Sequence, residues 1–363
     1  MKLFFNKEFL DLTDPKIAKV IGWDTNIVTH AGRFHADDVF SVALTILVRE
    51  LFHEQKYTMD ELVKIIHRAP RIEQIVNMDK KDLENIASKD CDNSLYLDLF
   101  GGDFDHHFTN PDDLITVYDK DKTMTVTLAT FGTMWYKTTI GAAFNNSFKV
   151  RRATIDKAGL LPVHQSVFWN NIRLIDNRDN YGPSIESPIS DIISHMNLNE
   201  SDDNIIKVPA EKHIEGSDSM EEIQRQKFEN FLNAVLFAKN ILQGWIIQEQ
   251  NVFTTLENLE KAKVHLETNE FGFKFLVVEE GTKAFINPDI VKTIYPDVKV
   301  LINENPYSRD GSFRAIAIDS ETWKFPAELI DSPAEGQKFI HGQRFLMSFE
   351  TLEHLRMFMK TLK

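Results

Sequence analysis

Short apolar runs that end in polar loops alternate with stretches of helical periodicity along the first part of the chain. Residues 26–30 predict a strand that ends at a polar turn, and residues 39–52 follow with apolar side chains at helical spacing. The same order returns with a helix over residues 60–66, a short strand over residues 73–77 and a buried strand over residues 94–99. This alternation predicts an α/β fold, in which the loops follow the carboxyl ends of the strands.

The middle of the chain is more helical. Residues 126–138 and 167–175 are apolar and predict helices, the second of which leads into a polar segment over residues 176–182. Residues 197–219 are polar and poor in large apolar side chains, which indicates a loop or linker. A long helix is predicted over residues 221–250.

Beyond that helix the pattern changes to strand-like runs, followed by a final helix. The strands are predicted over residues 274–278, 298–302 and 313–318, and the helix over residues 350–360. A length of 363 residues also favours two domains. We therefore expect residues 1–255 to form a catalytic α/β domain with a parallel-rich sheet flanked by helices. Residues 256–363 are expected to form a smaller α+β domain.

Composition narrows the class of protein. The formal net charge of −14 argues against a broad surface for coating nucleic acid, although a local basic groove can exist on an acidic protein. The single cysteine, Cys91, excludes an intramolecular disulfide and fits a reducing compartment. No run reaches the roughly 18 apolar residues of a membrane span, and the first residues lack a signal-peptide pattern. We expect a cytoplasmic protein, with an organellar or nuclear address left open.

Three loops are rich in side chains that bind metals. They contain His30, His35, Asp37 and Asp38 in the first, Asp98, Asp105, His106 and His107 in the second, and Asp176 and Asp179 in the third. Imidazole and carboxylate ligands together suit Mn²⁺, Fe²⁺, Zn²⁺ or Mg²⁺ centres. Several carboxylates favour a pair of ions about 3.5–4 Å apart, an arrangement that activates water and holds a phosphoryl oxygen.

Each loop also has a purely structural interpretation. Asp37 lies where the N-cap of a helix is expected, and Asp176 and Asp179 are common turn formers. The positions of the three loops favour the metal-site interpretation, because each loop ends an apolar run. Such loops gather at one edge of an open α/β sheet.

Several segments resemble one known family. The segment 29–38, Thr-His-Ala-Gly-Arg-Phe-His-Ala-Asp-Asp, resembles the opening motif of the Myg-type (melanocyte-proliferating-gene) exonuclease family, a branch of the DHH phosphoesterases. The segment 97–102 resembles the strand end that precedes that family's Asp-His-His, here residues 105–107. Segments 309–314 and 339–345 resemble its second-domain motifs. The likeness is collinear over nearly the whole chain.

The resemblance implies a role for each matched residue. Metal ligands would be His30, His35, Asp37, Asp98, His107 and Asp176, with Asp98 bridging two ions. His106 would contact the scissile phosphate or act as a general acid, and Asp105 would orient a histidine through its ring N–H. The family tends to carry an aspartate three residues before position 176, where this chain has Arg173. Asp176 is therefore the preferred metal ligand of the third loop, and Asp179 is the alternative.

The second-domain motif implies substrate contacts. His341 and Arg344 would bind a phosphate or a terminal nucleotide, with Arg314 as a further candidate. The alternative interpretation is a surface turn before the last helix. The chain departs from the family's small residues at Leu346-Met347-Ser348, which weakens the match here more than at the metal loops.

The resulting hypothesis is that the protein is an enzyme, a metal-dependent phosphoesterase, and specifically an exonuclease that trims RNA from its 3′ end. It would use two divalent ions, for which Mn²⁺ is the first choice and Mg²⁺ or another ion the alternative. The RNA substrate and the direction come from the resemblance. One alternative is hydrolysis of a small phosphorylated metabolite or short oligonucleotide, which suits the acidic charge. Another is a non-catalytic metal-bound interaction module. A protein hydrolase is disfavoured because no His-Glu-x-x-His motif is present. The natural substrate, the resident metal and the oligomeric state stay open.

Overall fold

The protein is represented by a computed structural model that describes residues 3–69, 94–98, 104, 114–119, 122–145, 159–197, 218–279 and 286–363. The chain divides into two compact units. The first comprises Met1–Asn146 and Leu161–Gln248, and the second comprises Ser147–Leu160 and Glu249–Lys363. The division after Gln248 falls inside a long helix, α11 (Asp218–Lys261), which also contains the predicted boundary at residue 255.

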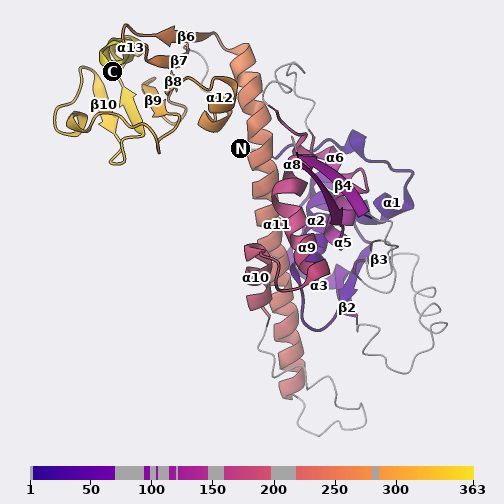
Figure 1. The fold of residues 1–363 in the computed structure, drawn as a ribbon. Coiled ribbons are helices and arrows are strands. Elements are labelled where there is room, and N and C mark those ends of the chain that lie inside the picture. Colours follow the sequence, from indigo (N-terminus) through magenta and orange to yellow (C-terminus); the bar gives the residue numbers. More distant parts are fainter. Residues whose placement is uncertain are drawn as a thin grey trace. The chain divides into compact units, whose positions relative to one another are not determined.

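The first unit is a mixed α/β structure (Figure 1). Its elements before α11 are η1 (Lys7–Phe9), α1 (Pro15–Ile21), β1 (Asn26–His30), α2 (Ala36–His53), α3 (Met59–Ile65), β2 (Ile66–Ala69), β3 (Ser94–Tyr96), β4 (Leu114–Asp119), β5 (Lys122–Thr127), α5 (Thr130–Tyr136), α6 (Ile140–Ala143), α8 (Val163–Val167), the π-helical η5 (Phe168–Ile172), α9 (Arg173–Tyr181) and α10 (Pro188–His195).

The described strands β2, β1 and β3 form a parallel sheet with β1 in the centre. Val28 pairs with His67 on one side and with Tyr96 on the other. Because the strands are parallel, their carboxyl ends meet at one edge of the sheet. The loop that follows β1 and the residues that follow β3 therefore lie side by side, as the sequence predicted.

Helix α2 is the central helix of this unit. It begins with two acidic residues, Asp37 and Asp38, in its first turn, where negative charge interacts favourably with the helix dipole. Every residue from Ala36 to Glu50 is buried, so the helix is covered on all sides. Trp245 of α11 stacks on Phe40 with ring centroids 5.2 Å apart, which fixes one face of α2.

Two predicted elements differ from the structure. The helix predicted over residues 126–138 is wrong at its start, because Val126 and Thr127 complete β5, which pairs with β4 in an antiparallel hairpin. The alternating threonines 123, 125 and 127 favour this strand. The polar segment 176–182 is helical in α9 up to Tyr181, and the helix ends at Gly182, whose φ is +81°. The strand predicted over residues 73–77 lies outside the described residues.

The second unit contains a six-stranded mixed sheet with the order β10-β11-β9-β8-β7-β6. Its elements after α11 are β6 (Val264–Thr268), β7 (Lys274–Val278), α12 (Pro288–Ile294), β8 (Val300–Glu304), β9 (Phe313–Ala317), η8 (Ala327–Ile330), β10 (Gln337–Ile340), β11 (Leu346–Phe349) and α13 (Leu352–Thr361).

Both faces of this sheet are packed. Leu355 and Met359 of α13 belong to the core on one face, and Val291 of α12 belongs to the core on the other. The predicted strand at 298–302 is shifted by two residues to β8, while β7 occupies the predicted range of 274–278. Among the helices that the structure describes in either unit, none is long and apolar enough to cross a membrane.

Candidate metal centre

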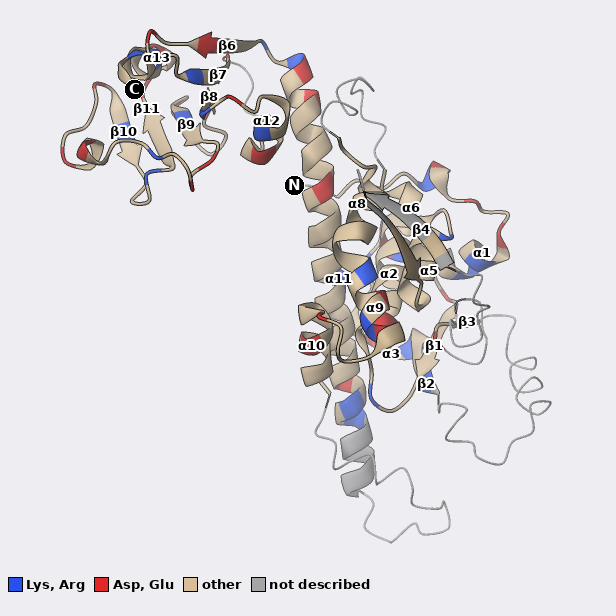
Figure 2. Cartoon of the chain, in the orientation of Figure 1, with Lys and Arg blue, Asp and Glu red and all other residues tan. Residues whose placement is uncertain are grey.

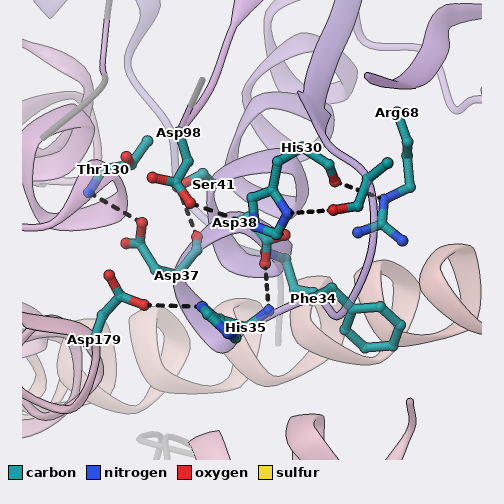
Figure 3. A network of polar contacts seen from close by, with 12 residues as sticks. His30, Phe34, His35, Asp37, Asp38, Ser41, Arg68, Asp98, Thr130 and Asp179 are labelled. Carbon is teal, nitrogen blue, oxygen red and sulfur yellow. Dashed lines mark hydrogen bonds and ion pairs between the residues drawn. The ribbon is translucent and has the colours of Figure 1, made fainter. Parts of the chain in front are cut away.

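A cluster of imidazoles and carboxylates forms at the carboxyl edge of the parallel sheet (Figure 3). We call it the acidic cluster, and it comprises His30, His35, Asp37, Asp38, Asp98, Asp176 and Asp179. His30 ends β1, and Asp98 follows β3 by two residues. Asp98 has a φ of +54°, a left-handed conformation that aspartate tolerates better than most residues and that is often found at functional sites.

The centre of the cluster is the His30 ring, which is almost fully buried. Its Nδ1 lies 3.0 Å from the carbonyl oxygen of Ala31. A carbonyl only accepts hydrogen bonds, so Nδ1 carries a proton. Nε2 lies 3.0 Å from Oδ2 of Asp38 and 3.5 Å from Oδ2 of Asp98. A cation between Nε2 and the two carboxylates would interact favourably with all three groups.

Asp38 holds the first loop in shape. Its Oδ1 accepts hydrogen bonds from the backbone N–H of His35 at 2.9 Å and of Val39 at 2.8 Å. Burial raises the pKa of the Asp38 carboxyl, but the facing His30 and then Arg68 and His35 outweigh it, so that this pKa is lowered overall. Asp38 therefore carries a negative charge in the centre of the cluster.

Asp37 is buried at the first turn of α2 and faces the start of α5. Its two carboxylate oxygens accept hydrogen bonds from the backbone N–H groups of Thr130 at 3.1 Å and Phe131 at 2.8 Å. Burial raises the pKa of Asp37 well above its ordinary value, and the negative charges of Asp179, Asp98 and Asp176 raise it further. The site thus gathers more negative charge than its own hydrogen bonds offset.

Asp176 is the deepest carboxylate from α9. Its Oδ1 accepts a hydrogen bond from the Gly132 N–H at 3.3 Å. Its Oδ2 is buried and has no hydrogen-bond partner among the described residues. A buried carboxylate oxygen without a partner is costly, and burial accordingly raises the pKa of Asp176 well above its ordinary value.

Asp179 lies one helical turn further along α9, at the outer side of the cluster. Its Oδ1 lies 3.4 Å from Nδ1 of His35, whose side chain is 45% exposed while that of Asp179 is 12% exposed. Both candidate ligands from the third loop thus reach the cluster, Asp176 at its buried side and Asp179 at its open side. The cluster is therefore closed around His30 and accessible at His35.

These residues fit a divalent metal centre in the chemical kind of their donors. Imidazole nitrogens and carboxylate oxygens are the ligands that Mn²⁺ and related ions use. The like charges around Asp37 and the unpartnered Oδ2 of Asp176 are features that a bound cation would neutralise. Within the described ranges, however, no three His, Cys, Asp or Glu side chains surround a single point as ligands of one ion would. The side chains are instead arranged as hydrogen-bonded and charged pairs.

The remaining predicted site residues lie elsewhere. Asp105, His106 and His107 fall outside the described residues. His341 and Arg344 lie in the turn between β10 and β11, where the Gln343 N–H donates to Nδ1 of His341 and Nη1 of Arg344 donates to the Phe325 carbonyl at 3.2 Å. Arg344 has a φ of +60°. The His341 side chain thus has a partner within the turn and the Arg344 side chain has one outside it, and their contact with a substrate stays a prediction.

Two features of the cluster were missed from the sequence. Asp38 was placed in the first loop but was not counted among the ligands, although its position three residues after His35 is the spacing of a helix-capping box. The backbone N–H groups of Thr130 and Phe131 contact Asp37 from a helix whose start was predicted as helical interior. No sequence signal pointed to that contact.

The fold and the site define an α/β protein with a buried imidazole–carboxylate cluster at a sheet edge. No family model matches the chain, and no curated protein matches it. Among solved structures, it is similar to the DHH domain of a member of a family of ribosomal proteins, with 14% identity over 100% of this chain and 94% of that one, at a TM-score of 0.23. A likeness at that level does not identify the family, so the functional argument depends on the cluster itself.

Proposed function

We propose that this protein is a metal-dependent phosphodiester hydrolase of the DHH type, close to the Myg-type exonucleases, that removes nucleotides from the 3′ end of RNA or short oligoribonucleotides. The observation that carries the proposal is the His30 Nε2 held between the carboxylates of Asp38 and Asp98. Three separate segments of the chain supply this buried, negatively charged site, as a metal-assisted reaction requires. The single cysteine leads us to place the activity in the cytoplasm.

In this proposal the chain's residues divide into ligands and positioning groups. His30, His35, Asp37, Asp98 and Asp176 would hold two divalent ions together with His107. The ions, when bound, would supply an acidified water and offset the charge of the scissile phosphate. The Ala31 carbonyl would orient His30 through Nδ1, as acceptors behind ligating histidines do, and leave Nε2 to face an ion beside Asp38. His106 would face the leaving oxygen, with Asp105 behind a histidine.

The test is hydrolysis of short oligoribonucleotides by the full chain, with Mn²⁺ and after chelation. We expect activity with Mn²⁺, a loss of at least about 100-fold in Asp98→Ala, and no activity with chelator. Asp60→Ala is the matched control, because Asp60 is an exposed acidic residue of α3 in the same unit. Equal activity of Asp98→Ala and wild type would refute the assignment. Release of single nucleotides from a 3′-labelled, but not a 3′-blocked, RNA tests the direction.

A further inference from the structure

A pocket of about 360 Å³ opens beside the acidic cluster within the first unit. Three members of the cluster line it, namely His35, Asp37 and Asp179. Arg33, Arg178, Ser190 and Ser194 line the same pocket. This volume lies at the small end of the range of about 300–1,000 Å³ that small-molecule sites occupy. A ligand in this pocket would therefore contact carboxylates together with guanidinium and hydroxyl groups.

The two arginines differ in what they contact. Arg178 braces the segment after α9, because its Nη1 donates to the carbonyls of Pro183 and Ile185 and its Nη2 lies 2.6 Å from Oδ1 of Asp191. Helix α9 carries both basic and acidic side chains (Figure 2). The contacts of the Arg178 guanidinium stabilise the segment that follows this helix. Arg33 is exposed, and its Nη2 donates to the hydroxyl of Ser194 at 2.7 Å.

Helix α10 and the residues after it hold Arg33 in position. The side-chain amide of Asn197 accepts from the Phe34 N–H at 2.9 Å and donates to the Phe34 carbonyl at 2.9 Å. The hydroxyl of Ser194, one turn earlier, accepts a hydrogen bond from the Arg33 guanidinium. The backbone next to Arg33 and the guanidinium itself are therefore both fixed from the same segment. A guanidinium has five N–H donors, so it can hold this hydroxyl and a phosphate oxygen together.

We infer that Arg33 is a specificity-determining residue that binds a second, non-reacting phosphate of the substrate in this pocket. The inference rests on the proposed function, and it names the substrate class as short oligonucleotides with a phosphate next to the scissile linkage. The acidic cluster cannot bind such a group without cations, since carboxylates repel phosphate. Arg33 and Ser194 supply a positive charge and a hydroxyl group in the pocket that His35, Asp37 and Asp179 also line, and that phosphate would lie against them.

The experiment compares three substrates with the Mn²⁺-loaded full chain: the dinucleotide pApA, its form ApA without the 5′-phosphate, and bis(p-nitrophenyl) phosphate. We expect wild type to prefer pApA over ApA by about 10-fold or more in kcat/KM, as a charge-assisted hydrogen bond implies. Arg33→Ala should remove this preference and leave the rates on ApA and on bis(p-nitrophenyl) phosphate within about two-fold. Arg33→Lys should keep part of it, because the charge remains.

Two further variants separate this role from a general loss of charge or of fold. Arg173→Ala removes a cation from α9 whose Nε donates to the Trp169 carbonyl and which does not line the pocket, so the preference should persist. Ser194→Ala should reduce the preference without abolishing it. An unchanged ratio of pApA to ApA in Arg33→Ala would overturn the inference.

The inference can also be tested apart from the proposed function. Binding of a pApA analogue with a non-hydrolysable internal methylene phosphonate is measured by calorimetry in the presence of Mn²⁺. Weaker binding to Arg33→Ala by about 10-fold or more supports the phosphate contact, whether or not wild type hydrolyses pApA. Equal binding by wild type and Arg33→Ala, or no binding by either, contradicts it. Absence of hydrolysis of all three substrates by wild type refutes the proposed function alone.

Discussion

Asp98 lies beside His30 because the parallel pairing of β1 and β3 brings the ends of the two strands together. Val28 pairs with Tyr96, and its carbonyl accepts a hydrogen bond from the Leu97 N–H at 2.9 Å, so Asp98 leaves the strand next to the end of β1. Their side chains approach to 3.5 Å between Nε2 and Oδ2. The strand pairing therefore brings the two residues to one edge of the sheet, where Asp98 turns out of the strand with a φ of +54°.

Divalent metal should stabilise the folded protein. A ligand that binds only the folded state adds about 2.7 kcal/mol to the free energy of unfolding when its free concentration is a hundred times Kd. We expect thermal unfolding with Mn²⁺ in place of chelator to show a clear rise in Tm for wild type and for Asp60→Asn. Asp98→Asn should lose most of the rise. An equal rise in Asp98→Asn would place the stabilising metal elsewhere.

The effect of pH on stability should reverse between the metal-free and the metal-bound protein. The pKa values of Asp37 and Asp176 are raised in the folded state, so their contribution to stability without metal is present at low pH and is lost as pH rises through the raised values. Metal competes with protons for the same oxygens, so its stabilising effect should grow over that interval. Urea unfolding between about pH 5 and pH 8, with chelator and with Mn²⁺, measures both trends.

Asp37→Asn isolates the part of that dependence due to one carboxyl. In the presence of chelator, its free energy of unfolding should change less with pH than that of wild type, because a group with a raised pKa has been removed. With Mn²⁺ present, the variant should show a smaller stabilisation by metal. Identical pH profiles for the two proteins in chelator would mean that Asp37 keeps its ordinary pKa.

Gly132→Ala should disturb the cluster from the α5 side. A Cβ at this position would overlap Oδ2 of Asp176, so the carboxylate must move. We expect a loss of about 1–3 kcal/mol in stability, together with weaker Mn²⁺ binding measured by calorimetry. Gly244→Ala is the control, since nothing lies within 4 Å of its added Cβ in α11, and it should stabilise the protein by about 0.5–1 kcal/mol. Unaltered metal binding in Gly132→Ala would separate Asp176 from the site.

Arg49→Met should destabilise the first unit strongly. Arg49 is fully buried, and its guanidinium donates to the carbonyls of Val20 at 2.8 Å, Thr25 at 2.7 Å and Lys19 at 3.1 Å. Removing the donors leaves buried carbonyls without them, so we expect a loss of about 3 kcal/mol or more in denaturant unfolding. Arg225→Met, which breaks an exposed pair with Glu229, should change stability by less than about 0.5 kcal/mol. Similar losses in both variants would contradict this account.

The sequence predicted the elements whose patterns are strongly periodic. The range of β1 was predicted correctly, and α2 was located with an error of three residues at its start, because alternating strand and helix patterns are local properties of the chain. The convergence of the first loop, Asp98 and α9 was also predicted, since parallel strands place their carboxyl ends at one edge. The assignment of metals to these residues stays a prediction.

Contacts between distant segments could not be predicted in the same way. The hairpin β4–β5 occupies part of a predicted helix because cross-strand pairing outweighed the local apolar pattern. The bonds from Thr130 and Phe131 to Asp37, and from Asn197 to Phe34, depend on how helices pack. The resemblance favoured Asp176 over Asp179 as the ligand, but the sequence did not predict the depth of either side chain, because that depth follows from the continuation of α9 through the polar segment.

The central claim is that the acidic cluster holds divalent metal, and a crystal of the full chain soaked in Mn²⁺ tests it most directly. Anomalous difference maps at the manganese edge should show two peaks about 3.5–4 Å apart, bounded by His30, Asp37 and Asp98. Asp98→Asn crystals soaked in the same way should lose at least one peak. Absence of any peak at the cluster in wild type, or peaks only at surface carboxylates, would contradict the account.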